Sequence, residues 1–114
     1  MYHLPMRHKK DDGDIPQNIT ENGLPAADTL RRDGRLRDAG RIAFLRDHFA
    51  AAHRAIQEGV PLESYHVWSL LDNFEWDQGY AQRWGIIYVD YPTQTRTPKR
   101  SAHWYRDVIT RNGI

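Results

Sequence analysis

The longest regular pattern of apolar residues in this chain lies between residues 38 and 58. Apolar side chains recur there every three or four positions, at Ile42, Leu45, Phe49, Ala52 and Ile56. This period predicts an amphipathic helix with one face turned to a core. Asp38 precedes the pattern as a candidate N-cap, and Gly59 and Pro61 follow it as stop signals. The helix is therefore expected to end near Glu58.

A second pattern of the same period predicts a shorter helix near the end of the sequence. Its apolar positions are Ala102, Tyr105, Val108 and Ile109. Thr97 is the expected N-cap, Pro98 suits the first turn, and the pair Asn112-Gly113 suits the end. Residues 6–12 are polar and typical of the tail of a further helix.

Three other segments have the composition of strands. Residues 17–20 follow the turn-forming Asp14-Ile15-Pro16, residues 62–71 end in apolar side chains, and residues 83–89 are rich in aromatic and β-branched residues. Residues 24–35 mix proline, glycine and charged residues and indicate a loop. Strands that alternate with helices predict an α/β fold with parallel strands. No repeat or linker divides the chain.

Composition narrows the possible functions. The net charge is +1, so no overall field attracts nucleic acid or an anionic membrane, and neither is an expected partner. The one basic cluster, residues 7–10, is expected to be a solvated helix end. There is no cysteine, which excludes disulfides, thiolate metal sites and a cysteine nucleophile. The six histidines have no metal-ligand spacing, and we expect no cofactor or metal. No secretory apolar segment follows Met1, and we expect a cytoplasmic location.

The most informative segment is Trp68-Ser-Leu-Leu-Asp-Asn-Phe-Glu-Trp76. An apolar run ends abruptly there in Asp72, Asn73, Glu75 and Trp76. Carboxylate and amide groups bind sugar hydroxyls, and a flat indole covers the apolar face of a sugar ring. The segment therefore indicates a carbohydrate site at the end of a strand. The alternative is a strand followed by a capped turn, with the tryptophans as core residues.

A second segment, Ile19-Thr-Glu-Asn-Gly23, places Glu21 where a short strand becomes a loop. In a barrel of parallel strands this edge is the catalytic rim. By itself the segment is equally consistent with a turn that carries an exposed glutamate. With the tryptophan-rich segment downstream, it indicates two neighbouring strand ends of one site.

These two segments, followed by Arg83-Trp-Gly-Ile-Ile-Tyr-Val-Asp-Tyr91, resemble the C-terminal part of family 1 glycoside hydrolases of the β-glucosidase type. The resemblance covers residues 14–114, whereas residues 1–13 match poorly and are expected to be a helix remnant. It implies a (β/α)8 TIM barrel, and 114 residues fall short of the roughly 250 of such a barrel. We therefore expect a C-terminal fragment with the last two strands and helices and a hairpin-like insertion.

The resemblance also implies roles for individual residues. Glu21 matches the catalytic nucleophile of a retaining glycosidase, and Glu75 and Trp76 match residues that bind hydroxyls of the terminal sugar. Trp68 matches the aromatic residue beneath that sugar. Trp84 matches a pocket wall but departs from the family, which usually has phenylalanine there. Because Glu75 and Trp76 are kept, an unphosphorylated sugar is implied.

The family's acid/base residue lies in an Asn-Glu-Pro motif that this sequence lacks. Three interpretations follow from the sequence. The chain is part of a β-glucosidase, a non-enzymatic product that keeps sugar contacts, or a piece that assembles with a partner fragment, namely the remaining N-terminal barrel portion. The expected ligand is a β-glucoside or short β-linked oligosaccharide. The 114 residues alone are expected to be inactive, because groups that act as a unit are missing.

Overall fold

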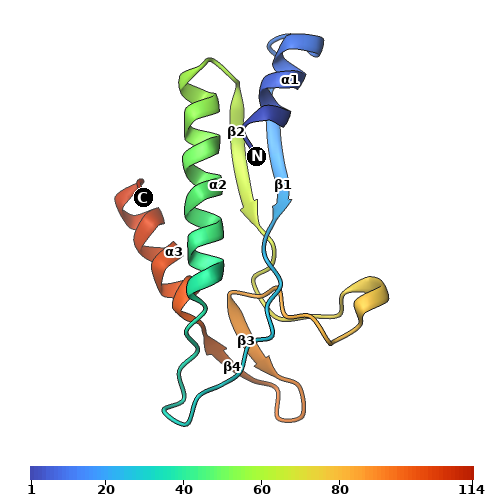
Figure 1. Cartoon of the computed structure of the whole chain (residues 1–114), viewed down its shortest axis with the longest axis vertical. Helices are drawn as coiled ribbons and strands as arrows, with labels where there is room; N and C mark the ends of the chain where they lie inside the picture. Colours follow the sequence, from blue (N-terminus) through green and yellow to red (C-terminus); the bar gives the residue numbers. More distant parts are fainter.

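The computed structural model describes residues 1–114. Three helices, four strands and one short 3₁₀ helix follow one another along the chain (Figure 1). In chain order they are α1 (His3–Asp12), β1 (Gln17–Asn22), α2 (Ala39–Gln57), β2 (Leu62–Val67), η1 (Trp76–Gln78), β3 (Ile87–Asp90), β4 (Thr95–Pro98) and α3 (Arg100–Arg111).

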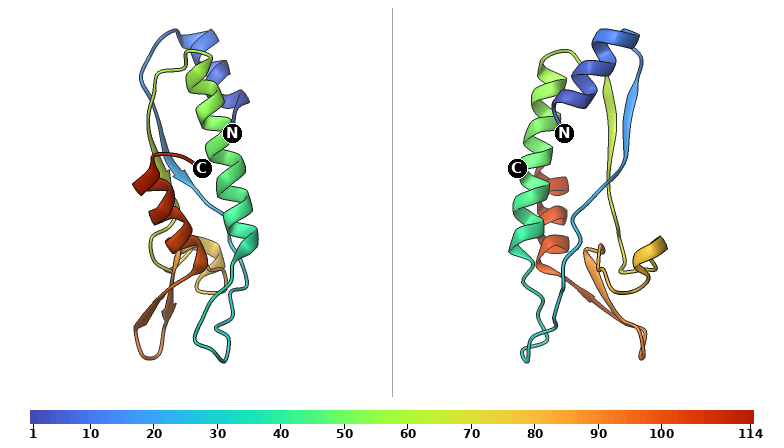
Figure 2. Two further views of the ribbon diagram at one scale, coloured as in Figure 1. Left: turned by 90° about the vertical axis from the view of Figure 1, so that its left-hand side faces the viewer. Right: turned by 45° about the vertical axis from the view of Figure 1, so that its right-hand side comes forward.

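Strands β1 and β2 pair in parallel, as the strand–helix–strand pattern predicts, and α2 is the crossover between them. The register pairs Gln17 with Leu62 and Asn22 with Val67, with irregularities between these positions. Figure 2 shows α2 and α3 on one side of this pair and an uncovered face on the other. Because parallel strands point the same way, both deliver their following loops to the same end of the sheet.

The core lies between the sheet and the two long helices. Leu45 and Ala55 are fully buried in α2, and Val108 of α3 packs nearby. The ring of Phe49 lies 4.7 Å from that of Tyr65 in β2, and it also contacts the two aromatic residues Trp104 and Tyr105 of α3. The predicted apolar stripe of α2 is thus confirmed over most of its length, but Ile56 is 46% exposed because α3 ends before covering it.

The chain after β2 folds differently from its sequence-based prediction. Strand β2 ends at Val67 rather than at residue 71, and the regular strand β3 begins at Ile87 rather than at residue 83. Thr97 and Pro98 belong to β4, which pairs antiparallel with β3, so neither residue begins α3. Lys99 holds the N-cap position of α3 instead. The predicted strand at residues 62–71 is therefore the shorter β2, and the one predicted at residues 83–89 is the first strand of a separate hairpin.

Asp38 holds the N-cap position of α2 as expected, but its side chain does not cap the backbone N–H groups of that helix. Its two carboxylate oxygens instead accept hydrogen bonds from the backbone N–H of Ser101, at 2.9 Å, and from the Ser101 hydroxyl. Ser101 lies in the first turn of α3, where backbone N–H groups have no partner within the helix. One residue thus joins the starts of α2 and α3.

Helix α1 begins earlier than the polar segment from which it was predicted. Its last turn carries Lys9 and Lys10, and its exposed Arg7 and His8 face the acidic residues one turn later. The basic cluster is therefore a solvated helix end, as expected. The proposed division of the chain at residue 13 stays a prediction. None of the helices is long and apolar enough to cross a membrane.

The molecule is elongated and flat, measuring 49 × 34 × 18 Å. Its radius of gyration is 15.9 Å, compared with about 13 Å for a compact domain of this length. Only 16 of the 114 residues are buried, so much apolar surface stays open. The α/β class is confirmed, and the two-stranded parallel sheet of these residues does not close into a barrel.

Candidate functional site

The candidate site is built at the end of the sheet where β1 and β2 stop. Asn22 and Val67 are paired in register, and Tyr65 of β2 donates a hydrogen bond to the side chain of Asn22. Tyr65 also packs on Phe49 of α2, so this side of the strands faces the helix. Side chains alternate along a strand. Strand β1 is irregular between Ile19 and Asn22, so this alternation is interrupted there. Glu21 is exposed, and Trp68, the first residue after β2, is half-buried.

Glycine at position 23 brings the two strand ends together. The backbone N–H of Trp68 donates to the carbonyl of Asn22 at 2.9 Å. Immediately beyond, Gly23 lies so close to the Trp68 carbonyl that a Cβ atom there would be 1.7 Å from its oxygen. Only glycine allows this approach. The glycine that the sequence marked as a turn signal thus fixes the spacing between the segment of Glu21 and that of Trp68.

Glu75 lies against Trp68 although seven positions separate them. The indole nitrogen of Trp68 donates to a Glu75 carboxylate oxygen at 3.5 Å, and Glu75 is half-buried. Glu21, in contrast, is exposed and has no hydrogen-bond or ion-pair partner among these residues. The structure therefore places Glu21, Trp68 and Glu75 on one rim, with the carboxylate of Glu21 free.

Trp76 opens the short helix η1 and is 84% exposed, the most exposed large apolar side chain of the chain. A tight turn holds its neighbour Glu75, whose backbone N–H donates to the carbonyl of Gly79 at 2.8 Å. Figure 1 shows η1 in a loop that extends away from the rest of the molecule. The Glu75-Trp76 pair thus stands on a projecting loop with its indole in solvent.

Trp84 is joined to the same rim by its backbone, whose carbonyl accepts from the N–H of Ser69 at 3.1 Å. Its side chain is half-buried, and its indole N–H is enclosed by protein atoms without an acceptor. Any contact of Trp84 with a ligand is therefore made by the ring and not by the N–H group.

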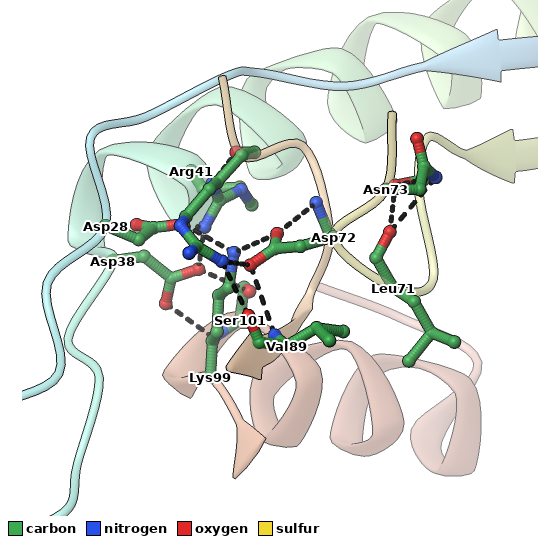
Figure 3. A network of polar contacts seen from close by, with 12 residues as sticks. Asp28, Asp38, Arg41, Leu71, Asp72, Asn73, Val89, Lys99 and Ser101 are labelled. Carbon is green, nitrogen blue, oxygen red and sulfur yellow. Dashed lines mark hydrogen bonds and ion pairs between the residues drawn. The ribbon is translucent and has the colours of Figure 1, made fainter. Parts of the chain in front are cut away.

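Of the two residues expected to bind sugar beside Glu75, Asp72 is used inside the protein instead, and Asn73 bonds partly within its own segment. The side chain of Asp72 is fully buried and accepts from Arg83, Lys99 and two backbone N–H groups. The amide of Asn73 donates to the carbonyl of Leu71 at 3.1 Å, within its own segment (Figure 3). The interpretation of Asp72 and Asn73 as sugar ligands is wrong for Asp72, because a carboxylate with all its acceptor positions filled has none left for hydroxyls.

Asp72 belongs to a buried ion network of three carboxylates and three cations, shown in Figure 3 in part. Its members are Asp28, Asp38, Arg41, Asp72, Arg83 and Lys99. Lys99 is fully buried and donates to Asp28 at 2.5 Å and to Asp72 at 2.8 Å. Opposite charges balance in this buried network, as burial requires.

The arginines of this network stay charged. Burial lowers the pKa of Arg41, but its hydrogen bonds and charge interactions with Asp28 and Asp38 outweigh burial and leave the pKa raised. For Arg83 burial also lowers the pKa, and the hydrogen bond to Asp72 contributes to a net rise. Sequence reasoning missed this network, because its members lie on five segments and only Asp72 and Arg83 stand within recognisable motifs.

The principal cavities lie elsewhere. The apolar one, of about 630 Å³, lies between α2, β2 and α3 and is lined by residues such as Phe49, Ile56 and Tyr105. Two others border the loop that precedes α2. None of the three includes Glu21 or Glu75. The hollow expected around a sugar is thus not one of these three cavities. Chemically, the rim offers one free carboxylate and a carboxylate–indole pair.

Comparison with known proteins connects this chain to a family. The sequence model of glycosyl hydrolase family 1 matches residues 1–114. Beta-glucosidase A of Thermotoga maritima is 55% identical over 96 residues, which are 84% of this chain and 22% of that protein. Beta-glucosidase A of Acetivibrio thermocellus is 45% identical over 114 residues, which are 100% of this chain and 25% of that protein.

The fold comparison agrees. The structure of the Thermotoga maritima β-glucosidase in complex with glucoimidazole superposes with a TM-score of 0.97 at 49% identity, over 99% of this chain and 26% of that one.

A 6-phospho-beta-galactosidase of Streptococcus equi subsp. zooepidemicus is 44% identical in sequence over 115 residues, 100% of this chain and 24% of that protein. The chain thus spans about a quarter of the length of the relatives that it matches.

Proposed function

Because this chain belongs to glycosyl hydrolase family 1, we propose that it supplies the nucleophile and part of the sugar-binding surface of a retaining β-glucosidase. The proposed substrate is a β-linked, non-reducing terminal glucose or a closely related sugar. The main support is the free, exposed carboxylate of Glu21, which shares a rim with Trp68 and Glu75. A nucleophile must be unobstructed, and Glu21 meets this condition, whereas the carboxylate of Asp72 is enclosed by its donors.

In the proposed reaction, a Glu21 oxygen attacks the anomeric carbon, the bond to the leaving-group oxygen breaks, and a glycosyl ester forms. Water then hydrolyses this ester and regenerates the carboxylate. Retaining enzymes hold a second carboxyl group about 5–5.5 Å from the nucleophile to protonate the leaving group. Glu75 is not proposed for this role, because it matches the family's glutamate that binds hydroxyls of the terminal sugar. Glu75 and Trp76 are proposed to bind sugar hydroxyls instead.

The acid/base is proposed to come from barrel sequence outside these 114 residues, so that the chain alone does not hydrolyse glycosides. Two features support this. The sequence has no Asn-Glu-Pro motif, and Glu21 has no partner here that would orient it. A retaining mechanism depends on groups that act as a unit, so the loss of one removes most of the rate.

An unphosphorylated sugar is proposed. A 6-phospho-beta-galactosidase is about as similar to this chain as some β-glucosidases are, so overall identity does not distinguish the two substrate classes. The proposal relies on Glu75 and Trp76, which the phosphate-sugar enzymes are expected to replace. The Trp68 indole N–H lies close to the Glu75 carboxylate. A donor and an acceptor for sugar hydroxyls therefore stand side by side, which supports the proposal.

The test is a chimeric barrel, in which residues 1–114 replace the matching quarter of the Thermotoga maritima enzyme. We expect this protein to hydrolyse a chromogenic β-glucoside and to prefer it to the 6-phosphorylated substrate. Glu21→Gln is expected to abolish hydrolysis, whereas Glu63→Gln, an exposed glutamate on β2, is the matched control. A folded chimera without hydrolysis, or one that is unaffected by Glu21→Gln, would contradict the proposal.

A further inference from the structure

We propose that Asp72, although buried away from any sugar, is a positioning residue that holds the loop carrying Glu75 and Trp76 in its sugar-binding place. This inference rests on the proposed function, because it assigns a role in sugar binding at the same site. The carboxylate of Asp72, which the motif suggests as a sugar ligand, is turned toward the interior of the protein.

The first observation is the number of donors on this one side chain. One oxygen of Asp72 accepts from the Gly85 N–H at 3.0 Å and from Lys99 at 2.8 Å. The other accepts from Arg83 at 2.8 Å and from the Val89 N–H at 3.4 Å. The side chain is 0% exposed. Hydrogen bonds to an ionised acceptor in a buried place are the stronger kind.

The second observation is where these donors lie along the chain. Asp72 stands immediately before the loop of residues 73–82, and Arg83 and Gly85 stand immediately after it. Glu75 and Trp76 lie within this loop, which projects from the molecule. The carboxylate therefore joins the two ends of the sugar-binding loop. A Cβ atom at Gly85 would lie 2.2 Å from the Asp72 backbone nitrogen, so the two ends are also in direct contact.

Backbone hydrogen bonds also join the two segments that flank this loop. The N–H of Ile86 donates to Ser69 and that of Ile87 to Leu70, both at 2.9 Å. The N–H of Asp72 donates to the carbonyl of Ile87 at 3.0 Å. Beyond this base, the loop has its own turn from Glu75 to Gly79, the contact of Glu75 with Trp68, and the contact between the rings of Tyr80 and Tyr91. The base therefore fixes where the loop that carries Glu75 and Trp76 leaves and re-enters the molecule.

The third observation connects this base to the segment after Glu21. Lys99 bridges Asp72 to Asp28, which lies in the loop that follows β1 (Figure 3). The carbonyl of Arg83 accepts from Arg41 at 2.8 Å and from the N–H of Ala26 at 3.1 Å. The loop that follows β1, the strand of Glu21, is thus joined to the loop that carries Glu75 and Trp76. The connection runs through the base of the second loop.

The test uses Asp72→Asn in the chimeric barrel. The amide keeps the size of the carboxylate but directs an NH₂ group at donors, so two of the bonds become donor–donor contacts. We expect KM for the β-glucoside and the dissociation constant of deoxynojirimycin to rise together, by about tenfold or more, and kcat to change less.

Arg83→Lys is the second variant, in case Asp72→Asn does not fold. Lysine keeps the charge but lacks the planar guanidinium, whose Nη1 group donates to both Asp72 and the Val89 carbonyl and whose carbon lies over the ring of Tyr88. The same paired rise, smaller in size, is expected. Asp107→Asn, an exposed carboxylate beside Arg106, is the matched control and should leave both constants within about twofold.

The outcomes separate the two proposals. A folded parent chimera that neither hydrolyses the glucoside nor binds deoxynojirimycin would overturn the proposed function itself. A parent that binds, with folded variants whose KM and dissociation constant stay within twofold while only the melting temperature falls, would show that Asp72 is merely structural and overturn the positioning role. A paired rise in folded variants supports it.

Discussion

At the scale of single residues, Gly23 shows how closely the two halves of the rim approach. An alanine Cβ at this position would meet the Trp68 oxygen at 1.7 Å and its carbonyl carbon at 2.8 Å. Backbone atoms cannot swing aside as a flexible side chain can. We expect Gly23→Ala to cost about 1–3 kcal/mol or more and to lower sugar binding in the chimera. Gly40→Ala, where nothing lies near the added methyl group, is the control in the same denaturation experiment.

A pH dependence follows from Tyr65. Burial raises the pKa of its hydroxyl above the ordinary value, with a smaller contribution from Tyr105. In the unfolded chain Tyr65 titrates near pH 10, and in the folded chain it keeps its proton at higher pH. Deprotonation therefore favours the unfolded chain, and the free energy of unfolding should fall as the pH rises above about 10.

Tyr65→Phe isolates this effect from the other tyrosines. The variant loses the hydrogen bond to Asn22, so it should be less stable at neutral pH, and its alkaline loss of stability should be smaller. Urea unfolding between neutral and alkaline pH measures both quantities. Equal alkaline slopes for parent and variant would rule out Tyr65 as a source of the dependence.

The residues of the rim could be found from the sequence because they stand in short motifs at strand ends. Glu21, Trp68 and Glu75 come together because parallel strands end at one edge, which local patterns predict. Asp72 could not be assigned correctly, because a carboxylate in a polar motif has the same appearance whether it faces a ligand or a lysine 27 positions away. Only the fold reveals that Lys99 is opposite.

At the scale of elements, the ion network decides how α2, α3 and the hairpin fit together. Lys99 begins α3 and reaches Asp28 and Asp72 from a fully buried position. Lys99→Met would leave three carboxylates facing two cations. Removing one partner of a buried pair costs about 3–5 kcal/mol, and we expect a loss of this size in the unfolding free energy.

The comparison with Arg46→Met tests this expectation. Arg46 is exposed on α2 and contacts only the neighbouring Asp47 at 3.2 Å, so its replacement should change stability by less than about 1 kcal/mol. Similar unfolding free energies for the two variants would mean that the network adds nothing to the packing of the elements.

The type of a helix or strand could be predicted from the sequence where its apolar spacing repeats over many residues. Helix α2 and the parallel strands follow from repeated apolar spacing, whereas β4 does not. Thr97 and Pro98 are typical of a helix start, yet pairing with β3 places them in a strand, and the helix begins after Lys99. Pairing with another strand outweighs the local preference of Thr97 and Pro98, and this pairing cannot be recognised from a short stretch of sequence.

At the scale of the whole molecule, the open apolar surface is the main feature. Ile109 and Ile114 are 63% and 59% exposed beside the cavity that also holds Ile56. With so little surface buried, the chain should be markedly less stable alone than within the chimeric barrel, where the uncovered sheet face is packed. Thermal unfolding of both proteins measures this, and equal melting temperatures would contradict it.

The central claim, that Glu21 is the nucleophile, has one direct test. The chimeric barrel would be treated with a 2-fluoro-glucoside carrying an activated leaving group, which traps the glycosyl ester of retaining enzymes, and the labelled peptide would be identified by mass spectrometry. The account predicts one sugar per chain, attached to Glu21 and absent from Glu21→Gln. A label on Glu75 or on another carboxylate, or an active enzyme that forms no ester, would contradict it.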